Sequence, residues 1–167
     1  SLLQAGVAHI VVVLGHDADR LIPLVERRGQ REWVLNPRYL EGKTTSIKKG
    51  LAAVPQRDAT EILLLNVDQP RSPDTLRLLL ERHREHGGLI TVPVFGGKGG
   101  HPIILAAGLI SELQAIEEEN QGIKAVACRH VDETVRVDLG APEILWDLNT
   151  PEQYKDAINT DGQPPGQ

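Results

Sequence analysis

An aspartate stands directly after a strongly apolar stretch of the chain. Residues 61–67 contain Ile62 and a run of leucines, and Asp68 follows them just before Pro70 turns the chain. A carboxylate at the end of a buried strand is costly unless it meets water, a cation or a hydrogen-bond donor. Mg²⁺ held by one or two carboxylates and by substrate phosphates would satisfy Asp68. An aspartate that only caps the turn is an interpretation of equal weight.

Two further oxygen-bearing side chains precede the start of a helix near the end of the chain. Thr150 and Gln153 have the spacing of a capping box, and Pro151 occupies the first helical position. A well-formed helix start therefore explains these three residues. It does not explain Asp147 and Asn149, which we interpret as a second metal ligand and its neighbour.

Gly42 precedes a segment whose hydroxyls and lysines could meet an anion. The backbone N–H groups at a helix N-terminus, the Ser46 hydroxyl and nearby lysines suit a negatively charged ligand. The spacing of a Walker loop is absent. Ser46-x-x-Lys49 matches part of a β-lactamase motif, but its companion motifs are missing, so chance is the better explanation.

Four glycines surround Lys98 in the segment that leads to His101 and Pro102. The commoner use of such glycines is a hairpin turn that needs positive φ angles. The alternative is that Lys98 and His101 close over a substrate. The sequence leaves both interpretations open.

The order of apolar segments indicates how these residues are positioned. Apolar or alternating runs typical of strands occupy residues 10–14, 31–35, 61–67, 89–94, 102–105 and 134–139. Helical spacing of apolar residues occurs in residues 17–28, 44–54, 72–86, 110–118, 122–129 and from 150 onward. This alternation favours an α/β sandwich with a mostly parallel sheet. Ligands of such sheets bind beyond the carboxyl ends of the strands, where Asp68 lies.

Composition narrows the classes of protein that fit. The 167 residues predict one domain, since domains average about 150 residues. With 18 Lys+Arg against 23 Asp+Glu, the net charge of −5 argues against a nucleic-acid binder. No apolar run approaches the about 20 residues that span a membrane. Cys128 is the only cysteine, so no intrachain disulfide can form and a cytoplasmic location is expected.

The residues at the two ends of the chain also allow predictions. Residues 1–6 have the pattern of a helix end, so we expect an earlier strand and helix to be missing. The chain contains no methionine, even at position 1, which is typical of a processed product or a piece of a longer protein. We expect a domain over residues 1–158 and a polar tail or linker over 159–167.

Six short motifs follow one another along the chain. They are Ala5-Gly6-Val7 with Val11 to His16, Asn36-Pro37 with Tyr39, Gly42, Ser46 and Gly50, Leu65-x-x-Asp68-Gln69-Pro70, Gly99-Gly100-His101-Pro102, Gly122-Ile123-Lys124-Ala125, and Asp147-x-Asn149-Thr150-Pro151-Glu152. In this order they resemble the MobA-like NTP transferases, especially the branch that includes molybdenum cofactor cytidylyltransferase. The resemblance runs from Ala5 to Tyr154, and the six motifs together are specific although each alone is weak.

The resemblance implies a fold and a reaction. The fold is a GT-A-like, Rossmann-type three-layer α/β/α sandwich, the nucleotide-diphospho-sugar transferase fold. The reaction is transfer of a nucleoside monophosphate from an NTP to a phosphorylated small acceptor such as molybdopterin, with release of pyrophosphate. CTP is the favoured nucleotide, Mg²⁺ the expected cofactor and Mn²⁺ an alternative. No nucleic-acid or membrane partner is implied, whereas a second domain and a homo-oligomer are left open.

The same resemblance implies roles for individual residues. The metal ligands would be Asp68, Asp147 and Asn149. The nucleotide contacts would be Gly42, Ser46, Asn66 and Gln69. The acceptor would meet Lys98 and His101, and the catalytic residues would be Asp68 and His101.

Three departures from the family pattern limit these expectations. The N-terminal signature L-A-A-G-x-S-x-R-M-G with its lysine, which holds the triphosphate, is absent, so the chain as given is expected to be poorly active. Residues 120–122 replace a common Gly-Asp-x-Gly, and Asn149 stands where the cytidylyltransferase branch has Asp. The alternatives are a sugar-phosphate nucleotidyltransferase, a GT-A glycosyltransferase with residues 66–68 in place of Asp-x-Asp, and a non-catalytic nucleotide-binding domain.

Overall fold

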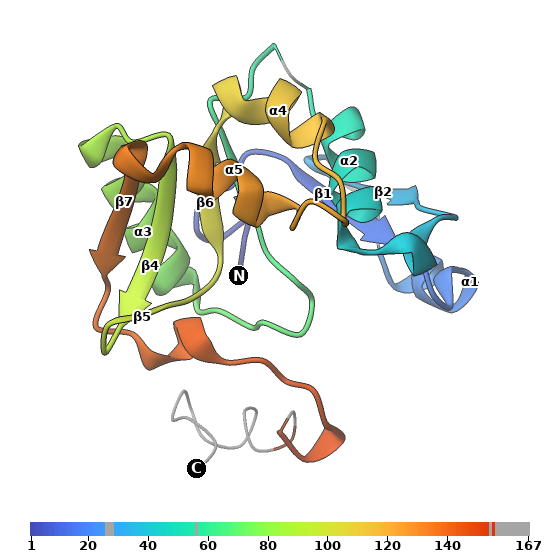
Figure 1. Cartoon of the computed structure of the whole chain (residues 1–167). Coiled ribbons are helices and arrows are strands. Elements are labelled where there is room, and N and C mark those ends of the chain that lie inside the picture. Colours follow the sequence, from blue (N-terminus) through green and yellow to red (C-terminus); the bar gives the residue numbers. More distant parts are fainter. Residues whose placement is uncertain (26–28, 56, 154, 156–167) are drawn as a thin grey trace. The chain divides into compact units, whose positions relative to one another are not determined.

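The computed structural model describes residues 1–25, 29–55, 57–153 and 155, and it divides into two compact units (Figure 1). The Gly42 unit comprises residues 6–61 and 106–132. The Asp68 unit comprises residues 1–5, 62–105 and the chain from 133 onward. None of the described helices is both long and apolar enough to cross a lipid bilayer. Each unit is described by itself below.

The first half of the Gly42 unit is built on two parallel strands. Strand β1 (Ile10–Leu14) pairs with β2 (Arg31–Leu35), with Ile10 opposite Arg31. Helix α2 (Lys43–Ala53) packs against both strands. The helix predicted over 17–28 is only α1 (Ala18–Leu21) followed by a 3₁₀ turn (Ile22–Leu24), because Pro23 lacks the N–H that an α-helix needs there; residues 26–28 of that prediction lie outside the described residues.

The second half of this unit contains two short helices. A 3₁₀ turn (Ala107–Leu109) leads into α4 (Ile110–Gln114), and α5 (Ile123–Arg129) follows after a turn. The helix predicted over 110–118 therefore ends earlier than expected. The turn places Gln121 and Gly122 at positive φ angles, so the chain cannot continue as a helix from α4 to α5.

The Asp68 unit is organised around one central strand. Its sheet has the order β3 (Glu61–Leu64), β6 (Ile103–Ala106), β4 (Ile90–Phe95) and β5 (Lys98–Gly99), and β7 (Thr134–Asp138) also pairs with β4. The β4–β7 pairing is parallel, whereas β4 is antiparallel to β5 and to β6. The glycine-rich segment reverses the chain after β4, which explains why this part of the sheet is mixed.

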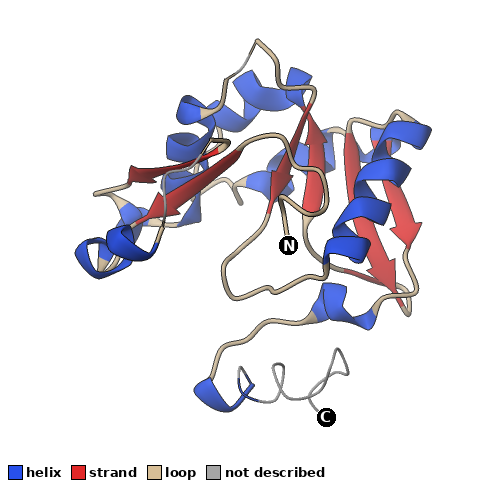
Figure 2. Cartoon of the chain, turned by 180° about the vertical axis from the view of Figure 1, so that it is seen from behind, coloured by secondary structure: helices blue, strands red, loops and turns tan. Residues whose placement is uncertain are grey.

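Helix α3 (Pro73–His86) covers this sheet, and Figure 2 shows it lying along β4 and β7. The Ser72 hydroxyl accepts from the Thr75 amide at 3.1 Å, and Gly87 ends the helix at φ 65°. Both ends confirm the predicted helix start and stop. Leu76 and Leu79 of α3 are fully buried in the core.

Three boundaries near the candidate residues differ from the prediction or cannot be compared with it. Strand β3 ends at Leu64, so the residues from 65 to Pro70 form a loop instead of the end of a strand. A 3₁₀ turn (Pro142–Leu145) that was not anticipated precedes Asp147. Residues 151–153 are helical as expected, and the predicted tail over 159–167 lies outside the described residues.

Candidate functional site

The loop after β3 and the segment before residue 150 meet within the Asp68 unit. The Leu148 amide donates to the Asp68 carbonyl oxygen at 2.8 Å. The side-chain amide of Gln69, which is buried, donates to Asp147 Oδ1 at 2.7 Å, and its Oε1 accepts from the Asn66 amide at 3.4 Å. Two motifs separated by 78 residues are thus joined by a backbone and a side-chain hydrogen bond.

Asn149 lies in the same segment, at the start of the final described helix. Gln153 Oε1 accepts from the amides of Asn149 and Thr150, and the Thr150 hydroxyl accepts from the Gln153 amide at 3.2 Å. These bonds confirm the predicted capping box. They also place the backbone amide of Asn149 in the cap, while its exposed side chain stands next to Asp147 in sequence.

The oxygen atoms around Asp68 suit a hard divalent cation. Gln69 engages one oxygen of Asp147, which leaves the second oxygen and the Asp68 carboxylate as ligands of the type that Mg²⁺ takes. Mg²⁺ binds few protein carboxylates and keeps water or phosphate at its other positions. In the described part of the chain, no cluster of three or more His, Cys, Asp or Glu side chains is arranged as a metal site.

Arg71 is the residue of this region that sequence reasoning missed. It is only 5% exposed, and its guanidinium donates to the carbonyl oxygens of Pro70, His101, Ile144 and Trp146 at 2.7–3.1 Å. The only local signal was a charged residue between a turn proline and a helix cap. The segments that bury it are 30 to 75 residues away along the chain, so spacing could not reveal them.

Burial and nearby charges have opposite effects on the pKa of Arg71. Burial lowers the pKa of the guanidinium from its usual value. The negative charges of Glu143, Asp147 and Asp68 oppose that change in pKa. Glu143 is held nearby because its Oε1 accepts from the Ser72 amide at 3.0 Å. The site therefore combines a buried cation with three surrounding carboxylates.

The glycine-rich segment forms the hairpin that was the commoner interpretation. Phe95 of β4 pairs with Lys98 of β5, and Gly96 and Gly97 between them have φ angles of 56° and 80°. Both Lys98 and His101 are exposed. The His101 amide donates to the Ile144 carbonyl oxygen at 2.9 Å, which ties the end of this segment to the 3₁₀ turn before Asp147.

In the Gly42 unit, Ser46 belongs to a hydrogen-bond chain that starts at Asn36. Asn36 is 3% exposed, and its side-chain amide donates to the hydroxyl oxygens of Thr45 and Ser46, both at 2.9 Å. Its Oδ1 accepts from the Arg38 amide at 3.1 Å. The motif that begins with Asn36 therefore sets the direction of the Ser46 hydroxyl.

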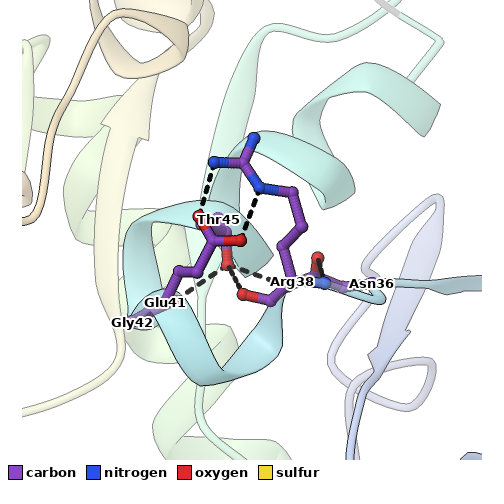
Figure 3. Close-up of polar contacts among 5 residues, drawn as sticks. All are labelled: Asn36, Arg38, Glu41, Gly42 and Thr45. Atoms are coloured by element: carbon purple, nitrogen blue, oxygen red, sulfur yellow. Dashed lines mark hydrogen bonds and ion pairs between the residues drawn. The ribbon is translucent and has the colours of Figure 1, made fainter.

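Figure 3 shows how the turn before α2 is held. The Thr45 hydroxyl lies 3.0 Å from the Arg38 carbonyl oxygen and 2.9 Å from that of Gly42, and it can donate to either. The Arg38 guanidinium donates to both carboxylate oxygens of Glu41, which lowers the pKa of that carboxyl. This exposed pair and the Thr45 bonds fix the turn that carries Gly42.

A carboxylate of the chain itself occupies the N-terminus of α2. Glu118 Oε2 accepts from the Thr44 amide at 2.9 Å. A Cβ at Gly42 would lie 2.5 Å from Glu118 Cδ, and Gly42 has a φ of 109°, so only glycine fits there. The sequence predicted an anion at this helix start, and the anion that the structure places there is Glu118. Sequence spacing gave no signal for this contact because 74 residues separate its partners.

Glu118 gives the helix start a dependence on acidity that can be measured. The Thr44 hydrogen bonds, the backbone one foremost, and the charge of Lys43 lower the pKa of Glu118. At a pH above the ordinary pKa of an unfolded-state glutamate, about 4.3, the charged form of Glu118 stabilises the fold. This stabilisation is lost as the pH falls through the lower folded-state pKa. We expect the wild-type chain to have a higher Tm than Glu118→Gln at pH 6, and the difference to close as the pH falls through the lowered pKa of Glu118. Glu119→Gln, which changes an exposed neighbour, should show no such difference; a gap that persists in acid would contradict the assignment.

A hollow of about 510 Å³ lies elsewhere in the Gly42 unit. It is lined by α4, α5 and the turn that joins them, including Glu112, Glu117, Glu119 and Arg129. Arg129 donates to Glu112, so the main positive charge of the lining is paired. Gly122 and Ala125 of the fifth motif line the hollow, but it includes none of the residues for which a catalytic or binding role is predicted.

The structure thus brings together Asp68, Gln69 and Asp147, with Asn66 and Asn149 beside them in the same segments. His101 is linked to them through Ile144 and Arg71, and Lys98 lies on the neighbouring hairpin. Gly42 and Ser46 belong to the other unit, where they are neighbours at the start of α2.

The chain is similar in sequence to proteins of known family. The family described as the MobA-like NTP transferase domain matches residues 1–134. The chain is 25% identical over 163 residues to the bifunctional protein GlmU of Clavibacter sepedonicus, an alignment that covers 95% of this chain and 31% of GlmU. It is 26% identical over 147 residues to the molybdenum cofactor cytidylyltransferase of Escherichia coli K12, covering 88% of this chain and 72% of the relative. The chain therefore spans about a third of GlmU.

A solved structure supports the same assignment of fold. The protein Rv0371c of Mycobacterium tuberculosis H37Rv aligns with a TM-score of 0.71 at 25% identity, covering 93% of this chain and 78% of that one. A structure of the same protein with manganese aligns with a TM-score of 0.67 at 24% identity, covering 92% and 79%. The α/β fold class predicted from the sequence is confirmed.

Proposed function

Because the chain belongs to the MobA-like NTP transferase family, we propose that it transfers a nucleoside monophosphate from an NTP to a phosphorylated small molecule. The observation that carries this proposal is the hydrogen bond from Gln69 to Asp147, which joins two motifs that each supply a carboxylate. We propose CTP as the nucleotide and a molybdopterin-like acceptor, because the Escherichia coli relative is a molybdenum cofactor cytidylyltransferase.

In this proposal Asp68 and Asp147, with Asn149 beside them, hold a divalent cation. Their oxygens suit Mg²⁺, and the manganese complex of the Mycobacterium tuberculosis relative supports Mn²⁺ as an alternative. The bound ion would supply positive charge that stabilises the developing pyrophosphate. Gln69 would orient Asp147 by donating to one of its oxygens, and Asn66 would meet the nucleotide from the same loop.

Residues of the Gly42 unit are proposed to contact the base and ribose. The Ser46 oxygen accepts from Asn36, which leaves the Ser46 proton as the donor toward a ligand. Gly42 offers backbone at a point where no side chain fits. We expect Glu118 to move when an anionic part of a ligand approaches this turn, because two anions would otherwise share one helix terminus.

The reaction itself needs no nucleophilic side chain. An oxygen of the acceptor phosphate attacks the α-phosphorus of the NTP, and the bond from that phosphorus to the bridging oxygen of the β-phosphate breaks, which releases pyrophosphate. The attacking oxygen is already anionic, so no proton must be removed. Lys98 and His101, both exposed, are proposed to bind the acceptor phosphate, with His101 close to the attacking oxygen.

A thermal-shift panel tests this function. CTP, GTP, ATP and UTP are each added to this chain with and without Mg²⁺. A nucleotide at about 100 times its Kd stabilises the folded state by about 2.7 kcal/mol, a rise of several degrees in Tm. We expect a Mg²⁺-dependent rise in Tm with CTP.

The other outcomes of the panel discriminate between functions. A rise with another NTP would keep nucleotidyl transfer and change the base. Product formation with a sugar 1-phosphate instead of a pterin phosphate would favour the sugar-nucleotide alternative. No rise with any nucleotide would contradict the proposed function.

A further inference from the structure

Arg71 joins three segments that are far apart in sequence. Its Nε donates to the His101 carbonyl oxygen, one terminal nitrogen donates to Pro70, and the other donates to Ile144 and Trp146. The guanidinium is almost fully buried. All three nitrogens therefore donate to backbone oxygens. Each of these bonds fixes the position of a backbone segment and not of a side chain.

Each of these segments carries a residue of the proposed site. Pro70 follows Asp68 and Gln69 directly, and Trp146 directly precedes Asp147. Two further bonds close the arrangement around Arg71. The Leu148 amide donates to the Asp68 carbonyl oxygen, and the amide of His101 donates to the same Ile144 oxygen that Arg71 contacts.

The Arg71 guanidinium donates its hydrogen bonds to backbone oxygens and to no carboxylate of the described residues. The acceptors of its bonds are neutral carbonyl oxygens, while Asp68, Asp147 and Glu143 attract the guanidinium electrostatically. Burial of a charge is costly unless it is well hydrogen-bonded. Arg71 thus forms no hydrogen bond to the carboxylates of Asp68 and Asp147, although its charge attracts both of them.

We propose that Arg71 is the positioning residue that sets the separation of Asp68 and Asp147 for a divalent cation. This inference rests on the proposed function, since it takes these two carboxylates as the cation ligands. A lysine could not do the same, because an ammonium group presents its donors from one point, whereas the planar guanidinium reaches carbonyls on several sides.

Charge and position predict opposite effects of removing Arg71. By charge alone, the loss of a cation beside two carboxylates would tighten the binding of a metal ion. By position, loss of the bonds to His101, Ile144 and Trp146 would let the carboxylates separate and would weaken binding. The sign of the change therefore distinguishes a positioning residue from a purely electrostatic or structural one.

The test measures the Kd of Mn²⁺ alone by electron paramagnetic resonance of the free ion. The variants are Arg71→Lys, which keeps the charge, and Arg71→Gln, which keeps a planar donor without charge. Asp147→Asn serves as the reference for loss of a ligand. Arg77→Lys is the matched control, because Arg77 is a more exposed arginine of α3 that contacts Asp74 and the Gln4 carbonyl. Far-UV circular dichroism checks the fold of each variant.

Loss of a residue that orients metal ligands weakens metal affinity about 10- to 100-fold. We expect about tenfold weaker Mn²⁺ binding in both Arg71 variants and an unchanged Kd in Arg77→Lys. If Arg71→Lys does not fold, Arg71→Gln decides alone, since unchanged or tighter binding there would overturn the inference. An unchanged Kd in the Arg71 variants while Asp147→Asn is weakened overturns only the role of Arg71. No Mn²⁺ binding by the unaltered chain overturns this inference together with the proposed metal site.

Discussion

We expect the Asp68→Asn chain to fold normally and to lose Mg²⁺-dependent nucleotide binding. The fold should survive because the backbone carbonyl of Asp68, which accepts from the Leu148 amide, is unaffected by the substitution. The loss should be complete because an uncharged amide replaces one of only two carboxylates proposed to hold the cation. The stabilisation of about 2.7 kcal/mol expected at 100 times Kd should vanish.

The measurement is the rise in Tm with the preferred NTP and Mg²⁺. Asp74→Asn is the matched control, because the Asp74 side chain is 88% exposed and forms only a surface pair with Arg77 among its described contacts. Both variants remove one negative charge from the same unit. An Asp68→Asn chain that still shows the full Mg²⁺-dependent rise would refute the assignment of Asp68 as a metal ligand.

A second large effect is expected at Gly100, where an added methyl group has no space. A Cβ on this residue would lie 2.4 Å from the Ile144 carbonyl oxygen and 2.9 Å from its carbonyl carbon. That oxygen accepts from the His101 amide and from Arg71, so moving it breaks two bonds at once. Overpacking costs about 1–3 kcal/mol, and buried groups left without partners cost about 1–3 kcal/mol more.

We therefore expect Gly100→Ala to lower the free energy of unfolding by about 3 kcal/mol or more, measured by urea denaturation. Gly108→Ala is the matched control, because a Cβ there meets no heavy atom within 4 Å and the φ of Gly108 is not in the left-handed region. The control should change stability by less than about 0.5 kcal/mol. If the two variants prove equally stable, the contact of Gly100 with Ile144 does not constrain the fold.

Local patterns were sufficient to predict most elements of this fold. The aliphatic run of β1 and the alternating residues of β7 mark strands because their side chains alternate between the two faces of a sheet. Helix α3 was bounded correctly because Ser72 and Gly87 act within one turn of its ends. The 3₁₀ turn at Pro23, which replaces the second half of a predicted helix, was not predicted from the sequence.

The candidate site was predictable where a residue's chemistry depends on its own chain segment. Asp68 and Asp147 stood out because a carboxylate followed an apolar run or preceded a helix cap. Arg71 and Glu118 did not, because an arginine after a turn and a glutamate in an acidic run have ordinary local settings. Their partners lie tens of residues away, and only the folded chain brings them into contact.

Because Pro37 follows it, the Asn36 side chain that donates to Ser46 resists deamidation. Asparagine side chains deamidate when the backbone nitrogen of the next residue attacks the side-chain carbonyl carbon. Proline has no N–H at that nitrogen, so this attack is blocked at Asn36. Deamidation would turn the buried donor toward Thr45 and Ser46 into an acceptor. Pro37, which lies just beyond the end of β2, therefore also protects this amide from deamidation.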